Sequence, residues 1–560
     1  MSLWRFRGGI HLAGHKKESS GEALRVAALP PQLILPLRQS AGTAAEPLVQ
    51  VGDEVLGGQM LARPGGPISA AVHAPTSGRI VAIEPLAVPH PSGLSAPCIV
   101  LEADGFDHWL EATPVEDPLA LPADEVGRLL REAGLVGLGG AVFPSHAKLR
   151  KPVGTLILNG AECEPWITCD DALMRSEPAA ILDGAHLLAH ALGARRILIG
   201  VEDNKPEAIA ALRRALADFA LPPAMTIAVE VLPTRYPTGG ERQLMRVLTG
   251  IEVPYGQLGP DYGVQVFNVG TAHAAHRALR LGRPLTERLV TLTGNVERPG
   301  NVRVRLGTPM RELLALAGVK PDTDRVLMGG PMMGFALPDL GVPVVKASNC
   351  LLAASPSLFP PPPPELPCIR CGRCARACPM DLQPFELYWF ARARLLGKAQ
   401  EYHLFDCIEC GCCAYVCPAH IRLVDYYRYA KGEIRARERD KQAADQARQR
   451  YEFRLFREER EKAEKAARLA AKAAETRARL AAEGAGEGGG EGNAGPAAAG
   501  PAGDEAKKAL IAAALARAQA QKAASEPANT ANLTSGQQAQ IEAIEARRAE
   551  IERKEPKRGD

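Results

Sequence analysis

The chain lacks the long apolar runs and the charge imbalance that mark two large classes of protein. No stretch of eighteen consecutive apolar residues occurs among its 560 residues, so no membrane-spanning helix is expected. The stretch MSLWRFRGGIHLAGHKK contains no apolar run long enough for the core of a signal peptide, so we expect the protein to be kept in the cytoplasm. The formal net charge is only +3, which gives no electrostatic argument for a nucleic-acid partner.

Aromatic residues are also scarce, and none follows Phe456. After Arg422 the composition turns to Ala, Glu, Lys, Arg and Gln, and the stretch to about residue 482 is typical of a long solvated helix. The glycine-rich EGAGEGGGEGNAGPAAAGPAG then predicts a flexible break before another Ala-rich helical piece. We interpret residues 430–560 as a charged, helical or disordered low-complexity tail, with a docking helix for a partner protein as the alternative.

The first hundred residues alternate short Val, Ile and Leu runs with Gly and Pro, which predicts a small all-β unit. LVQVGDEVLGGQMLA and VHAPTSGRIVAIEP resemble the two halves of a biotinyl/lipoyl-like barrel-sandwich. Carrier members of that group acylate a lysine at a tight hairpin, and the corresponding ARPGGPIS has no lysine. We therefore expect a structural barrel-sandwich domain over residues 1–115.

The next part of the chain predicts an α/β domain over residues 122–280. VGTLILNG and ARRILIGVEDN have the pattern of buried strands, and EAIAALRRALADFA that of an amphipathic helix between such strands. This alternation favours a parallel sheet. Residues 286–336 then read as two strands, a turn and a helix, and resemble a soluble-ligand-binding β-grasp domain. Residues 355–367 are proline-rich and predict a stiff linker.

Cysteine, in contrast, is concentrated. Nine of the thirteen cysteines lie in CIRCGRCARACP (residues 368–379, the first cassette) and CIECGCCAYVCP (residues 407–418, the second cassette), and eight of these nine follow one repeated spacing. Each cassette reads C-x2-C-x2-C-x3-C-P, the run that bacterial two-cluster ferredoxins use for two [4Fe-4S] clusters. The alternative is a pair of zinc sites, but zinc takes four ligands as two pairs and has no use for a third evenly spaced cysteine. We therefore predict a ferredoxin-type domain over residues 368–422.

In such a run the fourth cysteine ligates the other cluster. By that rule the expected ligands are Cys368, Cys371, Cys374 and Cys417 for one cluster, and Cys407, Cys410, Cys413 and Cys378 for its partner. Cys412 lies outside the pattern and is not expected to ligate either cluster. Cys98 and Cys350 are interpreted as ordinary small buried residues.

Two stretches further upstream have the character of a ligand site. GLVGLGGAVFPSHAKL, residues 134–149, is a glycine-rich turn followed by Phe143 and Lys148. Glycines let backbone amides approach a phosphate, and a following lysine can pair with its charge. In LILNGAECEPWITCDD, residues 156–171, a strand ends in Asn159, Glu162 and Glu164. Open α/β sheets bind ligands at such strand ends.

Together these stretches resemble the NADH-binding flavoprotein subunit of respiratory complex I and its hydrogenase relatives. That family has a G-R-G-G-A-G-F-P loop, an N-A-D-E-S-E-P strand end, a Y-x-x-G-E-E segment and a further Asn-containing strand. The matching residues here are Gly137, Gly139, Gly140, Phe143, Asn159, Glu162, Glu164, Tyr236, Gly239, Glu241 and Asn268. The family's arginine, aspartate and first glutamate are replaced by Leu138, Ala161 and Gly240.

The complex I resemblance implies an FMN site and NADH as hydride donor, with FMN held by the glycine loop, Lys148 and Asn159. It implies that Glu162 and Glu164 face the nicotinamide or ribose side. The alternative is an inherited fold with an empty pocket, in which the clusters work alone.

Residues 1–430 as a whole resemble the RnfC/RsxC family of the Rnf/Rsx ion-translocating electron transport complexes. The order of parts carries this resemblance: the FRGGIHLAGHK start, barrel-sandwich, flavoprotein-like domain, β-grasp domain and two ferredoxin cassettes. It implies a peripheral translocase subunit on the cytoplasmic face of the inner membrane, which takes part in electron transfer between NADH and ferredoxin. The implied partners are integral-membrane and flavin-bearing subunits of the same complex, with ferredoxin as a further partner. The alternatives are a soluble cobalamin-reductase-like flavoprotein and a flavin-free electron relay.

Overall fold

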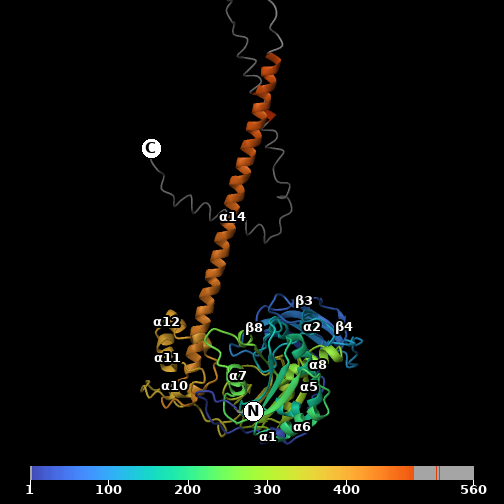
Figure 1. Ribbon diagram of the computed structural model, residues 1–560, viewed down its shortest axis with the longest axis vertical. Coiled ribbons are helices and arrows are strands. Elements are labelled where there is room, and N and C mark those ends of the chain that lie inside the picture. The colour runs from blue at the N-terminus through green and yellow to red at the C-terminus, as the bar shows by residue number, and fades with distance from the viewer. Residues whose placement is uncertain (1–2, 485–511, 514–515, 518–560) are drawn as a thin grey trace, which may run out of the picture. The chain divides into compact units, whose positions relative to one another are not determined.

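The computed structural model describes residues 3–484, 512–513 and 516–517 (Figure 1). The chain divides into two compact units, residues 1–448 and residues 449–560, which are described separately. The predicted flexible break after residue 482 and the Ala-rich piece beyond it lie almost wholly outside the described residues.

Residues 32–103 form the predicted all-β part of the first unit, with two small antiparallel sheets. The residues before them differ from the prediction, because they contain a short helix, α1 (Lys17–Ser20), and a strand, β1 (Arg25–Val26), that pairs with another sheet. One sheet has the order β2-β8-β7-β4, with β2 (Gln32–Pro36), β8 (Ser95–Ala103), β7 (Gly78–Ala87) and β4 (Glu54–Val55). The other has the order β3-β5-β6, with β3 (Glu46–Pro47), β5 (Met60–Arg63) and β6 (Val72–His73). Leu33 pairs with Leu101 and Leu35 with Ile99, and all four side chains are fully buried. Alternate strand residues therefore supply the core of this sandwich.

The predicted α/β domain contains a four-stranded, fully parallel sheet in the order β11-β10-β9-β12. Its strands are β9 (Thr155–Gly160), β10 (Arg196–Glu202), β11 (Thr226–Leu232) and β12 (Val264–Asn268). The helices of this region are α2 (Ala123–Glu132), α3 (Ser145–Lys148), α4 (Cys169–Ser176), α5 (Pro178–Leu192), α6 (Pro206–Ala217), α7 (Glu241–Thr249) and α8 (Val269–Arg280), with a 3-10 turn η1 (Gly259–Tyr262). In Figure 1, α5 and α8 lie side by side. Strands β9 and β10 carry the buried apolar runs Leu156–Leu158 and Ile197–Ile199, as expected where both faces of a parallel sheet are covered.

A six-stranded mixed sheet follows, in the order β1-β14-β13-β17-β15-β16. Its strands are β1 (Arg25–Val26), β13 (Glu287–Gly294), β14 (Gly300–Arg305), β15 (Arg325–Met328), β16 (Phe335–Ala336) and β17 (Cys350–Ala354), with helix α9 (Met310–Ala317) beside them. The predicted sequence of two strands, a turn and a helix matches β13, β14 and α9. Strands β1 and β17 extend the sheet with segments from outside residues 286–336.

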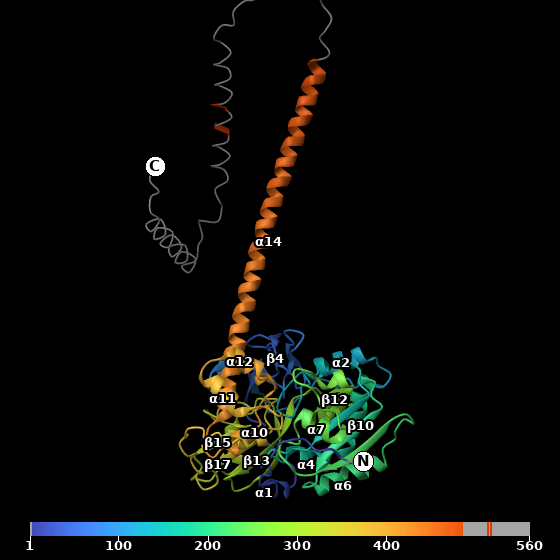
Figure 2. The same ribbon diagram turned by 60° about the vertical axis from the view of Figure 1, so that its left-hand side comes forward.

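The two cysteine cassettes lie in a separate small helical core (Figure 2). Its elements are α10 (Arg373–Ala377), α11 (Pro384–Arg392), α12 (Leu396–Glu401), η2 (Leu404–Asp406), α13 (Cys412–Tyr415) and the start of α14 (Leu423–Gly484). Tyr427 and Ile434 of α14 are buried, and the Lys431 amine donates to the Cys407 carbonyl over 2.6 Å. The core around the cassettes therefore continues to Ile434.

Residues 3–16, the N-terminal segment, cross between the α/β domain and the first cassette, and helix α1 (Lys17–Ser20) follows them. The Gly9 amide donates to the carbonyl of Ala377 over 2.9 Å, and Ile10 forms a β-bridge with Tyr236. Gly8 has φ +62°, and a Cβ there would lie 2.3 Å from the Cys378 carbonyl oxygen. Only glycine fits this close approach.

In the second unit, residues 449–484 are helical, and their described side chains are exposed. Arg454 with Glu458 and Arg457 with Glu461 form i,i+4 ion pairs, each at 3.5 Å. Such pairs stabilise a solvated helix by a few tenths of a kcal/mol each, about 0.3 to 0.5. The long solvated helix predicted from composition is therefore present over this range.

Candidate functional site: a cavity beside the second cassette

A cavity of about 350 Å³ lies at the carboxyl ends of the two strands β9 and β12. Asn159 and Asn268 are register partners at these ends, and both line the cavity. Open α/β sheets bind ligands at this edge, and the volume is in the range of small-molecule and cofactor sites.

Most of the residues predicted to bind a cofactor converge on this cavity. Those that line it are Gly139, Asn159, Glu162, Glu164, Tyr236, Gly239, Glu241 and Asn268. Gly137, Gly140, Phe143 and Lys148 do not line it. The Lys148 amine donates to the Val266 carbonyl over 2.9 Å and lies 3.2 Å from the Glu241 carboxylate. Lys148 therefore connects β12 to the start of α7.

The glycine loop is held on both sides at Leu138. The Leu138 amide donates to the Thr271 hydroxyl over 3.0 Å, and the buried guanidinium of Arg288 donates to the Leu138 carbonyl over 3.1 Å. Just beyond, the backbone amides of residues 139–141 are exposed and have no acceptor within the part of the chain described. An exposed row of free amides at the rim of a cavity can bind an anion such as the FMN phosphate.

Arg288 comes from β13, in the six-stranded sheet, so two domains position the loop. Sequence reasoning did not find Arg288, because its contact with Leu138 spans 150 residues and no local motif marks it.

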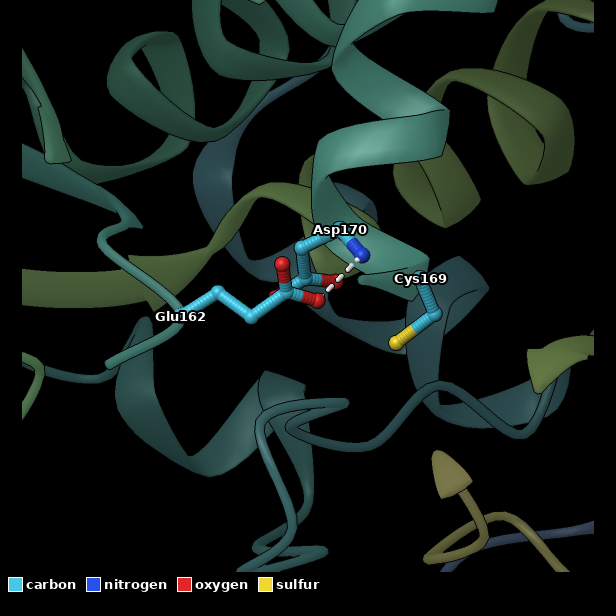
Figure 3. A group of neighbouring side chains, drawn as sticks. All are labelled: Glu162, Cys169 and Asp170. Atoms are coloured by element: carbon cyan, nitrogen blue, oxygen red, sulfur yellow. Dashed lines mark hydrogen bonds between the residues drawn. The ribbon is translucent and has the colours of Figure 1, made fainter. Parts of the chain in front are cut away.

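One wall of the cavity is a close group of Glu162, Cys169 and Asp170 (Figure 3). The Glu162 carboxylate accepts hydrogen bonds from the Asp170 amide over 2.7 Å and the Asp171 amide over 3.4 Å, at the N-terminus of α4. The Asp170 carboxylate accepts from the Asn268 side chain over 2.6 Å. The ligand-type atoms of the group lie within 4.8 Å of one another, but both carboxylates are committed to protein donors. We interpret the group as part of the cavity wall.

Burial raises the pKa of Glu162 to about 7, with the nearby Lys16 ammonium opposing the shift. Burial also raises the pKa of Asp170. The cavity wall therefore contains carboxyl groups that hold protons more tightly than they do in water.

Lys16, in the N-terminal segment, supports the cavity wall from behind. Its amine donates to the carbonyls of Glu162 over 2.6 Å, Glu164 over 2.8 Å and Ile167 over 2.5 Å, and lies 4.0 Å from the Glu162 carboxylate. One buried ammonium thus fixes the loop that follows β9. Lys16 is the last residue of the FRGGIHLAGHK segment quoted above, but sequence reasoning gave it no role at the site, because its contacts lie about 150 residues away in the chain.

Glu164 has one committed and one free oxygen. Its Oε1 accepts from the amides of Met332 over 2.7 Å and Met333 over 3.1 Å, whereas Oε2 is buried without a hydrogen-bond partner among the described residues. Glu164 thus ties the loop after β9 to residues 332–333, next to the six-stranded sheet.

The far side of the cavity belongs to the second cassette. Ile408 and Cys410 line it together with residues of the α/β domain. The hydroxyl of Tyr236, which is buried, donates to the Cys410 carbonyl over 2.7 Å. The cavity therefore touches a predicted cluster ligand directly.

The cassette thiols separate into two groups, each around its own small pocket. Cys368, Cys371, Cys374 and Cys417 line one pocket, and Cys378, Cys407, Cys410 and Cys413 line the other. Each group takes three cysteines from one cassette and the fourth from the other, and Cys412 lines neither pocket.

The donor set of each pocket suits a cubane better than a single metal ion. Three of its four thiols come from one evenly spaced C-x2-C-x2-C run and the fourth from the other cassette, as in two-cluster ferredoxins, whereas zinc takes its ligands as two pairs.

Comparison with known protein families gives four matches. Residues 4–106 match the RnfC barrel sandwich hybrid domain, residues 130–277 the Nuo51 FMN-binding domain, residues 289–336 the SLBB domain, and residues 367–421 the 4Fe-4S dicluster domain. The chain thus has an FMN-binding domain and a 4Fe-4S dicluster domain, and the predicted fold class is confirmed.

Curated relatives agree along most of the chain. The RnfC-type member of the ion-translocating oxidoreductase complex of Salmonella gallinarum is 48% identical over 463 residues, which are 82% of this chain and 68% of the relative. The chain belongs to the RnfC/RsxC family of ion-translocating oxidoreductase complexes. The family predicted from the sequence is therefore confirmed. The RnfC relative from Salmonella typhimurium is also 48% identical, and this chain spans only 62% of its length.

A solved structure of an NAD+-reducing [NiFe]-hydrogenase in the H2-reduced state aligns with 57% of this RnfC-family chain and 65% of its own. The sequence identity is 20% and the TM-score 0.40, so we draw no argument from it. No helix in the described part of the RnfC-family chain has both the length and the apolar character that crossing a bilayer requires.

The raised pKa of Glu162 predicts a pH dependence of stability. Because the folded state binds this proton more tightly than the unfolded chain, its contribution is complete below pH 4.5 and is lost as the pH rises through about 7. Relative to Glu162→Gln, the native chain should therefore lose roughly 1 to 3 kcal/mol between pH 5 and pH 8. Thermal unfolding of both proteins at several pH values measures this difference. The exposed Glu46, changed to Gln, is the control, and an equal pH slope in all three would contradict the prediction.

Proposed function

We propose that this RnfC-family protein passes electrons between NADH and its partners through FMN in the cavity and two [4Fe-4S] clusters. The complex is a multi-subunit, ion-translocating oxidoreductase, and we place the chain at its periphery, on the cytoplasmic face of the inner membrane. Its proposed partners are the integral-membrane and flavin-bearing subunits of the same complex, with ferredoxin as a further partner.

One observation carries the proposal: the same cavity is lined by the FMN-binding domain and by Cys410 of the second cassette. A flavin exchanges a two-electron hydride for single electrons, and clusters accept single electrons. A flavin in this cavity would lie next to the cluster held by Cys410, so it could pass single electrons to that cluster. A pocket that had lost its cofactor would not need to border a cluster ligand.

The chain's own residues supply binding and positioning. The free amides of residues 139–141 can bind a phosphate, and Thr271 and Arg288 hold the loop that presents them. Tyr236 lies at the boundary with the second cassette and fixes the Cys410 carbonyl. NADH as the hydride donor rests on the resemblance to the complex I flavoprotein.

The test is cofactor content followed by titration. The anaerobically purified full chain should contain about eight irons and about one FMN, and NADH should bleach the flavin absorbance. Eight irons without flavin would favour a simple electron relay, and bound flavin that NADH does not bleach would remove NADH as the donor. Co-purification with membranes distinguishes a member of the complex from a soluble cobalamin-reductase-like protein.

A further inference from the structure

The two predicted clusters differ in their access to solvent. Cys371 of the first cassette is exposed, whereas Cys378, Cys410 and Cys413, which belong to the other group, are buried. The buried group borders the cavity through Cys410. The cluster with Cys371 is therefore the one that an external electron-transfer partner can approach.

Three arginines lie within five residues of this exposed thiol in the sequence. Arg370 lies next to Cys371, and Arg373 and Arg376 follow at helical i,i+3 spacing on α10. All three are exposed, and in the part of the chain that the structure describes none forms a side-chain hydrogen bond or an ion pair. Three unpaired cations thus lie around one cluster edge.

The charges at the second cassette are, in contrast, compensated within the protein. Glu409 pairs with Arg428 and Lys431, each at 2.8 Å, and Asp406 pairs with Arg242 at 2.8 Å. The unpaired positive charge is therefore specific to the first cassette.

Exposed apolar side chains lie beside these arginines in the sequence. Ile369 is 69% exposed and Leu366 is 56% exposed. Arginine around an apolar centre is a combination enriched in protein interfaces. We call this surface the arginine face: Leu366, Ile369, Arg370, Cys371, Arg373 and Arg376.

We propose that the arginine face docks an acidic electron-transfer protein whose own cofactor lies close to its surface. One electron passes across the contact, so the donor cofactor is oxidised by one electron and the acceptor cofactor is reduced by one. No covalent bond forms or breaks, and no proton is transferred. Opposite charges steer such encounters and raise association rates, and small interfaces suffice for transient redox contacts.

An anionic membrane surface is the less favoured occupant. Binding to acidic lipids is typical of clusters of four to eight basic residues, and this face has three. The arginine face also contains a predicted cluster ligand, Cys371, and a lipid surface bound there would have no electron to exchange with the cluster.

The experiment uses the full chain with both clusters loaded, and it needs neither NADH nor FMN. This part of the proposal rests on the proposed function only through the clusters, so a failure of NADH oxidation leaves it intact. A dithionite-reduced acidic plant-type ferredoxin is mixed with the oxidised chain in a stopped-flow instrument, and the second-order rate is followed at low and high salt. In separate runs the reduced chain is mixed with the basic protein cytochrome c.

The charge-reversed variant is Arg370→Glu/Arg373→Glu, with Arg437→Glu/Arg439→Glu as the matched control at exposed positions of α14. The second-order rate with ferredoxin should be about tenfold lower in the charge-reversed variant than in the native chain. In the native chain this rate should also fall as the salt concentration rises. The control variant should stay within about twofold of the native rate. The rate with cytochrome c should rise in the variant. Iron content and EPR spectra confirm equal cluster loading.

If the double variant loses iron, Arg376→Glu and the salt dependence of the native chain carry the test. The proposal would be overturned if the rate with ferredoxin changed neither with salt concentration nor on charge reversal. Binding to phosphatidylglycerol vesicles that the charge reversal abolishes while ferredoxin rates stay unchanged would also overturn it, because the face would then be a membrane contact.

Discussion

Replacing Cys378 by alanine is expected to remove the cluster of the second cassette, although Cys378 belongs to the first. Its thiol lines a pocket with Cys407, Cys410 and Cys413, and the first cassette is completed by Cys417. A cubane left with three thiolates has lost one of its four protein ligands. Iron should fall from about eight to about four per chain, and the EPR signals of two interacting clusters should reduce to those of one.

Cys412→Ala is the matched control for this change. Cys412 is as buried as the ligands and adjacent to Cys413, but it lines neither pocket. The variant should keep about eight irons. If Cys378→Ala keeps both clusters, or loses the one held by Cys371, the ligand assignment is wrong.

Lys16→Met is expected to destabilise the chain by about 3 to 5 kcal/mol, because three backbone carbonyls lose their donor at roughly 1 to 3 kcal/mol each. The Glu162 carboxyl loses the cation that opposes the rise of its pKa, so it binds a proton over a wider pH range. Urea unfolding or thermal unfolding measures the effect, and the neighbouring Lys17→Met is the control, since Lys17 is exposed.

A double variant sharpens the test. In Lys16→Met/Glu162→Gln no carboxyl has to bind a proton in the folded state, so part of the lost stability should return at pH 8, above the Glu162 pKa of about 7, and little at pH 5. Additive losses in the double variant, or a Lys16→Met protein as stable as Lys17→Met, would show that the pair contributes nothing.

The fold was largely predictable because many of its elements have recognisable local sequence patterns. Strands such as β9 are uninterrupted apolar runs, and the cassettes carry their ligand spacing in twelve residues each. The exchange of the fourth cysteine was predictable for the same reason, since chain geometry near a C-x2-C-x2-C turn fixes which cluster each thiol can reach.

The cavity was predictable only in part. Asn159 and Asn268 follow from the rule on strand ends, but Lys16 and Arg288 reach the site from other domains. Lys148 was predicted to pair with a phosphate, and its amine contacts the Val266 carbonyl and the Glu241 carboxylate, so its role toward a ligand stays a prediction. A side chain's direction depends on packing between domains, which no short motif encodes.

The N-terminal segment also bears on how the protein is synthesised. Arg7 and Asp381 form an ion pair at 2.8 Å although 374 residues separate them, and Gly8 packs on the carbonyl of Cys378. At about 5 to 20 residues per second, the ribosome needs roughly 20 to 75 s to make the second partner after the first. The N-terminal segment therefore has no packing partner in the first cassette until the ribosome has passed that cassette. This segment is thus among the last parts of the chain to reach its final place.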